Sequence, residues 1–112
     1  MKRLVALLAV AALAAAAAAL AVPAFAATRT VGVGPQTKFS TSSLSISRGD
    51  TVRFRWSGRL PHNVRIASGP QRGTISRVRT RGTISRTFTR AGTYRIVCDV
   101  HLPGMRMTIR VR

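Results

Sequence analysis

Three side chains that can bind a soft metal ion lie within eight residues near the C-terminal end of the sequence. Cys98 offers a thiolate, His101 an imidazole and Met105 a thioether. A Pro-Gly pair directly before Met105 favours a tight turn, and a loop of this kind can direct all three side chains toward one point. The one other histidine in the chain, His62, is the candidate for a further ligand.

Two imidazoles, one thiolate and one thioether are the donor set of a blue-copper electron-transfer site, in which the methionine is a weak axial ligand. The sulfur donors favour Cu(I) and imidazole also suits Cu(II), so a rigid site of this composition tolerates both oxidation states. The sequence therefore predicts one copper ion. Two methionines qualify as the axial ligand, because Met105 and Met107 are two residues apart and share a face of the last predicted strand.

Each of these residues has an ordinary structural interpretation when taken alone, since a single cysteine or methionine is usually core packing. Their joint arrangement favours a metal site. Cys98 and His101 could also meet as a nucleophile and base, with Asp99 adjoining as the orienting group. These residues are better explained as metal ligands, and no oxyanion feature is evident, so we predict that the protein is not an enzyme. Structural zinc normally takes more than one cysteine. Copper delivery or storage would use the same ligands and stays as the alternative function, and a basic binding module without metal is the last alternative.

The elements that must position these ligands are short strands. The clearest runs from Thr51 to Trp56, where apolar and arginine side chains alternate with the period of two that marks a half-buried strand. Further strands are expected at 28–33, 44–47, 62–66, 72–78, 82–88, 93–98 and 105–111. No helical period follows residue 26, so we expect an all-β sandwich. The motif Arg-Gly-Thr-Ile-Ser-Arg at 72–77 and 81–86 predicts two neighbouring strands, or a strand and its loop, of similar sequence.

The first 26 residues have the layout of a secretory signal peptide. Lys2 and Arg3 precede an alanine-rich apolar run, and small residues at Ala24 and Ala26 end it. We expect this helical segment to be cleaved after Ala26, with Ala27 as the alternative position and an uncleaved membrane anchor as the other interpretation. The chain then divides into a signal peptide, 1–26, and one domain, 27–112, in the periplasm or outside the cell.

The predicted domain is strongly basic. Residues 27–112 carry seventeen lysine and arginine side chains against Asp50 and Asp99, a net charge of +15. Such a charge predicts acidic redox partner proteins, or association with an anionic envelope or membrane surface. Nucleic acid also attracts basic proteins, but export argues against it. Arginines on outward strand positions indicate either a solvated face or a docking surface for an acidic partner. We expect a monomer.

Several stretches together resemble the cupredoxin family, and in particular its plastocyanin-like small blue-copper proteins. The resemblance covers nearly all of residues 28–112. The stretches are Arg48-Gly49-Asp50-Thr51-Val52 with Phe54 and Trp56, Pro61-His62-Asn63-Val64, Ala91-Gly92-Thr93-Tyr94, Cys98-x-x-His101 and Gly104-Met105. The family implies a Greek-key β-sandwich, with His62, Cys98 and His101 as strong ligands and Met105, rather than Met107, as the axial one.

The resemblance also implies roles for residues near the ligands. Asn63 would hold the ligand loop by hydrogen bonding near Cys98. The ring edge of His101 would reach the surface, within an apolar docking patch formed by Leu60, Pro61, Leu102, Pro103 and Gly104. Asp99 departs from the family, which more often has a small hydroxyl residue after the cysteine. Strand parity predicts that its carboxylate points away from Cys98, so we expect it to affect the copper potential little.

Overall fold

The computed structural model describes residues 25–112, which form eight strands and one short 3₁₀ turn. The predicted signal segment falls outside the described residues, apart from its last two positions. The strands are β1 (Thr28–Val33), β2 (Ser43–Ile46), β3 (Thr51–Trp56), β4 (His62–Ser68), β5 (Gly73–Arg79), β6 (Thr83–Thr87), β7 (Gly92–Val97) and β8 (Arg106–Val111). Every predicted strand is present, with ends that differ by a residue or two. Within residues 25–112, no helix is long and apolar enough to cross a membrane.

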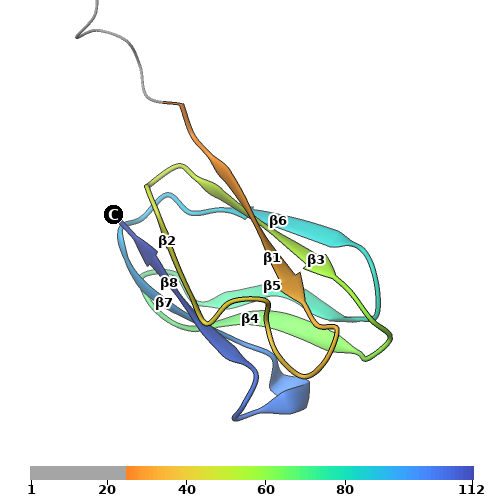
Figure 1. The fold of residues 1–112 in the computed structure, drawn as a ribbon. Helices are drawn as coiled ribbons and strands as arrows, with labels where there is room; N and C mark the ends of the chain where they lie inside the picture. The colour runs from red at the N-terminus through yellow and green to blue at the C-terminus, as the bar shows by residue number, and fades with distance from the viewer. Residues whose placement is uncertain (1–24) are drawn as a thin grey trace, which may run out of the picture.

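The strands make two sheets that face each other as a sandwich (Figure 1). One sheet has the order β1-β3-β6 and the other β2-β8-β7-β4-β5. Both contain one parallel pair, β1 with β3 and β2 with β8, while their remaining pairs are antiparallel. The predicted all-β sandwich is therefore confirmed.

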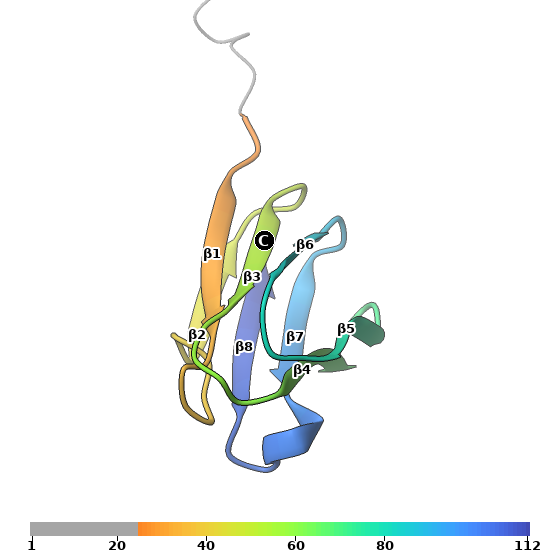
Figure 2. The same cartoon turned by 90° about the vertical axis from the view of Figure 1, so that its right-hand side faces the viewer.

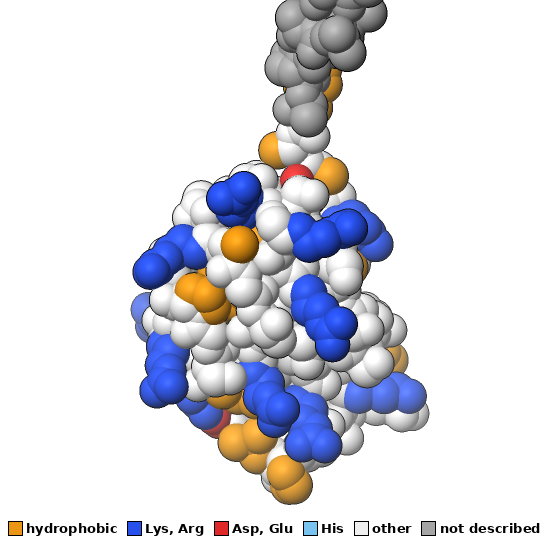
Figure 3. All heavy atoms as spheres, turned by 90° about the vertical axis from the view of Figure 1, so that its left-hand side faces the viewer, with side chains coloured by type: hydrophobic (Ala, Val, Ile, Leu, Met, Phe, Trp, Pro, Cys, Tyr) orange, Lys and Arg blue, Asp and Glu red, His pale blue; other side chains and the backbone are white. Residues whose placement is uncertain are grey.

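The core follows from the alternation seen in the sequence. In β3 the side chains of Val52, Phe54 and Trp56 are buried, while those of Arg53 and Arg55 are exposed. The other strands contribute inward residues in the same way, and together they form one cluster. Arginine side chains consequently occupy the outer faces of both sheets, and Figure 3 shows lysine and arginine side chains distributed over one whole side of the molecule.

The repeated hexapeptide occupies two consecutive strands that belong to different sheets. The first copy, residues 72–77, enters β5 at the edge of the five-stranded sheet, and the second, 81–86, enters β6 of the three-stranded sheet. The chain therefore crosses from one layer to the other between the copies, as Figure 2 shows. Both copies thus lie in edge strands that are only partly buried.

Tyr94 fixes the start of β7, the strand that leads into the ligand loop. Its ring is fully buried and packs edge-on against Phe88, and its hydroxyl donates to the carbonyl of Arg90 at 2.7 Å. We expect Tyr94→Phe to lower the free energy of unfolding by about 0.5–1.5 kcal/mol, the net value of one hydrogen bond. Denaturant unfolding measures this cost. An unchanged midpoint would show that water replaces the lost bond.

Candidate metal centre

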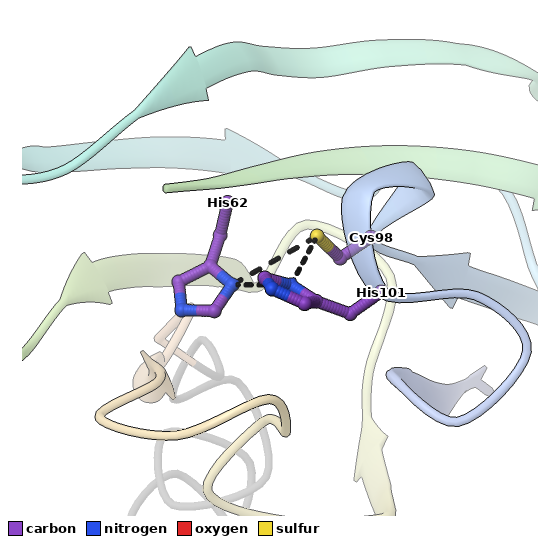
Figure 4. A group of neighbouring side chains, drawn as sticks. All are labelled: His62, Cys98 and His101. Atoms are coloured by element: carbon purple, nitrogen blue, oxygen red, sulfur yellow. Dashed lines mark hydrogen bonds between the residues drawn. The ribbon is translucent and has the colours of Figure 1, made fainter. Parts of the chain in front are cut away.

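The donor atoms of His62, Cys98 and His101 converge at one end of the sandwich, although they come from three different elements (Figure 4). His62 is the first residue of β4, Cys98 follows the end of β7, and His101 ends the 3₁₀ turn η1 (Asp99–His101). The η1 turn was not predicted from the sequence. The turn reverses the chain after Cys98, so that Nδ1 of His101 lies close to the Cys98 sulfur.

The three donor atoms form a compact triangle. The two Nδ1 atoms are 3.1 Å apart, and the Cys98 sulfur is 3.6 Å from Nδ1 of His101 and 3.9 Å from Nδ1 of His62. A point in their plane and equidistant from all three lies about 2.1 Å from each, which matches bonds of a first-row metal to imidazole and thiolate at roughly 2.0–2.3 Å. The triangle therefore has the size that His62, Cys98 and His101 would need to hold one such ion.

The surroundings favour metal-binding forms of these side chains. His62 and Cys98 are fully buried, and His101 is half-buried. Burial, and to a lesser degree the nearby His101, lowers the pKa of His62 below its usual range. Its ring is then neutral at neutral pH, which is the form that can donate an electron pair to a metal.

The methionines differ in their position relative to the cysteine. The backbone N–H of Cys98 donates to the carbonyl of Met105 at 3.0 Å, which continues the β7–β8 register past the Val97–Arg106 pair. Met105 thus lies directly opposite Cys98, where Cβ atoms are about 4.5–5.5 Å apart. Met107 lies opposite Ile96, one inward-facing pair deeper in the sandwich. Both side chains are buried.

Asn63 connects β4 to the ligand loop, as the family resemblance implied. Its side-chain oxygen accepts from the backbone N–H of Asp99 at 2.7 Å, and its side-chain nitrogen donates to the Asp99 carboxylate at 2.7 Å. These bonds fix the residue that follows Cys98. They span 36 positions in sequence, so they tie the His62 strand to the Cys98 loop.

The carboxylate of Asp99 forms an ion pair with Arg65, a contact that the sequence did not reveal. Arg65 donates to both of its oxygens, at 2.7–3.2 Å, and hydrogen bonds from Arg65 and then Asn63 lower the pKa of Asp99 to about 2. The carboxylate is therefore ionised and already paired. Its negative charge is compensated by Arg65, which fits the expectation that it affects the site little.

A glycine and a tryptophan complete the surroundings of His62, and sequence reasoning missed both roles. Gly34 has φ +99°, and a Cβ there would lie 2.4 Å from the Ser57 carbonyl oxygen and 3.2 Å from Nε2 of His62. Only a residue without a side chain fits against the ring. The Trp56 indole N–H donates to the His62 carbonyl at 3.0 Å. The Gly-Pro pair at 34–35 was the signal in the sequence that could have revealed the role of Gly34.

The apolar residues that flank His62 and His101 in sequence are exposed at the surface. Leu60 is 42% exposed and Leu102 48%, and Pro61, Pro103 and Gly104 are also exposed. Val100, at 45%, is exposed on the same loop and was not in the predicted patch. Figure 3 shows a hydrophobic group at the lower end of the molecule, the end that carries the ligand loop in Figure 1.

The chain is similar to known copper proteins in both sequence and fold. Residues 26–112 match the family described as "Copper binding proteins, plastocyanin/azurin family". No curated protein shows significant similarity to the chain. Among solved structures, amicyanin from Paracoccus versutus (Thiobacillus versutus) is 31% identical, with 84% of this chain and 88% of that chain covered and a TM-score of 0.65. The reduced Cu(I) form, at pH 4, of an amicyanin proline-to-glycine variant is 30% identical, with 84% and 89% covered and a TM-score of 0.65.

Proposed function

The chain belongs to the plastocyanin/azurin family of copper binding proteins, and on this premise we propose that it is an exported carrier of single electrons. Its copper ion would be held by His62, Cys98 and His101, with Met105 as the axial ligand. Copper supplies the one-electron Cu(II)/Cu(I) couple. The donor triangle is the observation that carries the proposal, because its size fits one ion and its composition suits both oxidation states.

Membership in this family of electron carriers agrees with the prediction that the chain is not an enzyme. The protein's own contribution is to hold the ligands still. Asn63 and the backbone bond between Cys98 and Met105 fix the loop on one side. On the other side, Gly34 lies against the His62 ring and Trp56 holds the His62 backbone carbonyl. A site that moves little between oxidation states needs little reorganisation when an electron arrives or leaves.

The enclosed ligands favour electron transfer over copper delivery or storage. His62 and Cys98 have no exposed surface, whereas a delivery protein needs its ligands open to an acceptor. His101 is the one proposed ligand that is not fully buried. A partner docked on the exposed apolar residues next to it in sequence would therefore lie close to the metal ligands.

The test is reversible redox chemistry in the purified protein. We expect the Cu(II) form to show an intense blue band that mild reductant bleaches and reoxidation restores without loss of metal. Equilibration with a copper chelator then separates the two functions. A carrier keeps its copper through repeated cycles, whereas ready loss of Cu(I) to the chelator would indicate delivery or storage instead.

The two methionines give a direct test of the axial position. We expect Met105→Leu to raise the reduction potential, because Cu(I) accepts three ligands more readily than Cu(II) does and so loses less when the axial donor is removed. Met107→Leu is the matched control, and it should leave the potential unchanged. Both replacements nearly conserve volume and should cost less than about 1.5 kcal/mol of stability. Voltammetry of the two variants measures the reduction potential. A shift of the potential in Met107→Leu alone would assign the axial position to Met107 instead of Met105.

The partner is proposed to be acidic, since two adjoining hollows beside the ligand loop are lined by cations. One, of about 410 Å³, includes Arg95 and Arg106, and the other, of about 450 Å³, includes Lys38 and again Arg106. Gly104, the residue before Met105, borders both, and neither contains an acidic side chain. A carboxylate-bearing segment seated there would lie against the loop that holds the ligands.

Charge reversal tests this docking surface. We expect the double variant Arg95→Glu, Arg106→Glu to weaken binding of a decaglutamate peptide several-fold, at about 0.2–1 kcal/mol for each lost contact. Arg53→Glu with Arg55→Glu is the control, because it changes net charge equally on the outer face of the other sheet. Titration calorimetry at low and high salt measures both. Equal losses of peptide affinity in the two double variants would mean that only the overall charge of the protein matters.

Export to the periplasm or the cell exterior is proposed from the basic, apolar and small-residue layout of positions 1–26, and the mature domain is proposed as residues 27–112, acting as a monomer. The net charge of +15 supports attraction to anionic envelope surfaces as well as to acidic proteins.

A further inference from the structure

Among residues 25–112, the first that hydrogen-bonds to the sandwich is Ala27, and an acidic side chain holds its nitrogen. The Ala27 N–H donates to Oδ1 of Asp50 at 2.9 Å, and its carbonyl accepts from the Thr51 N–H at 2.9 Å. Strand β1 begins one residue later, at Thr28. Before Ala27, the Phe25 side chain is 89% exposed, so it adds almost nothing to the packing of the domain.

Asp50 is fixed as an anion at this position. Its other oxygen, Oδ2, accepts from the Ser47 N–H at 2.9 Å, and its backbone bonds to Ser47 and Phe88. The hydrogen bonds from Ala27 and Ser47 lower the pKa of Asp50, with a smaller contribution from the nearby Arg29. Asp50 as a whole is 9% exposed, and of the contacts that its carboxylate makes only the one to Ala27 comes from a segment that processing would change.

We propose that Asp50 is a binding site for the free amino terminus that cleavage between Ala26 and Ala27 would create. This rests on the export proposed above. Hydrolysis by an external peptidase adds one water across the Ala26–Ala27 peptide bond. The Ala26 carbonyl carbon takes the hydroxyl, and the Ala27 nitrogen takes the proton and is protonated again to an ammonium group at neutral pH.

The cut changes the chemistry of a contact that is already in place. Before it, a neutral amide N–H donates to the Asp50 carboxylate. After it, an ammonium group faces the same oxygen, and hydrogen bonds between two ionised groups are shorter and roughly twice as strong as neutral ones. The folded domain is thereby stabilised by its own processing.

The same geometry selects between the two cleavage positions that the sequence left open. Cleavage after Ala27 would place the new amino group on Thr28, about 3.3 Å farther along the extended chain. It would also remove the Ala27 carbonyl, which accepts from Thr51. Only a chain that begins with Ala27 puts its amino group on Asp50 and keeps both contacts.

The experiment uses the full chain, exported and processed by a bacterial host. Intact mass gives the first residue, and NMR titration gives the α-amino pKa. We expect the product to begin at Ala27, with an α-amino pKa about one unit higher than in Asp50→Asn, because a carboxylate in contact stabilises the ammonium form. A glycine inserted before Ala27, which moves the amine off Asp50, is the second variant and should lower the pKa as Asp50→Asn does.

The pH dependence of stability gives an independent measure. A raised α-amino pKa means that the ion pair is complete below the ordinary value of about 7.7–8.0 and is lost as pH rises through the folded-state value. The thermal midpoint of the wild type should therefore fall more between pH 7 and pH 10 than that of the glycine-insertion variant. Arg29 keeps its charge across this pH range, so it contributes equally to the stability of the wild type and of the glycine-insertion variant.

Three results would overturn the proposal: a chain that keeps residues 1–26, a product that begins at Thr28, or α-amino pKa values that agree between the wild type and the glycine-insertion variant. The copper band is recorded on the same samples. Its absence would contradict electron transfer without bearing on Asp50, because β1 begins at the end of the sandwich opposite the ligand loop (Figure 1).

Discussion

Replacing Cys98 with alanine is expected to abolish the intense blue band of the Cu(II) protein completely. The band of such sites arises from charge transfer between the thiolate and copper, and Cys98 is the one cysteine in the chain. No other thiolate can take its place. Cys98→Ala also removes one corner of the donor triangle, so copper that still binds through His62 and His101 should show only weak visible absorption.

A matched control separates loss of the ligand from damage to the fold. Val97→Ala removes a buried side chain at the neighbouring position and leaves all proposed ligands in place. It should lower stability and keep the blue band. A Cys98→Ala protein that retains the band, or a wild type that stays colourless after Cu(II) titration, would contradict the electron-transfer proposal. Affinity for Cu(I) and zinc would then be the next measurement.

Asn63→Ala is expected to have the second largest effect, on both copper affinity and stability. The change removes two hydrogen bonds of 2.7 Å to Asp99 and leaves the Asp99 N–H without its partner. Loss of a bond that satisfies a partly buried polar group costs about 1–3 kcal/mol. Partners that orient metal ligands typically change affinity by about 10–100-fold when they are removed. Denaturant unfolding of the metal-free protein and competition with a copper chelator measure the two effects.

Arg65→Ala is the control, because Arg65 contacts the same carboxylate from the outside. The side chains of Arg65 and Asp99 are 38% and 39% exposed, so solvent screens their ion pair. Pairs of this kind contribute less than about 1 kcal/mol. We therefore expect Arg65→Ala to reduce stability less than Asn63→Ala and to change copper affinity little. Equal losses in the two variants would show that the ion pair, rather than the amide, positions the loop.

The spacing of the ligands explains why one short segment can supply most of a metal site. Cys98 and Met105 face each other because the β7–β8 register continues across the first bond of the loop. The η1 turn between them returns the His101 ring toward the sulfur, and the Met105 N–H closes the loop by donating to the His101 carbonyl at 3.1 Å. His62 arrives from β4, which pairs with β7 in the same sheet.

Local pattern in the sequence was enough to predict the strands and the donor set. Alternation in β3 and β8 identifies the buried face directly, because side chains on a strand point to opposite sides with a period of two. The metal could also be predicted, since two histidines, one cysteine and a nearby methionine leave few alternatives. These properties depend on residue type and on short spacing, and both can be read without knowledge of the fold.

Contacts between distant segments were decided only by the tertiary structure. The order of strands in the two sheets placed β4 beside β7 and so brought His62 to Cys98. It also paired Arg65 with Asp99, seated Gly34 against the His62 ring and set Asp50 against Ala27. Local sequence marks Gly34-Pro35 as an unusual backbone position, but it does not say which residues meet in any of these pairs. Each pair joins residues far apart in the chain, and their distance depends on how the sheets pack. Met105 and Met107 share a face of β8, and the register of β7 with β8 places Met105 opposite Cys98 and Met107 opposite Ile96.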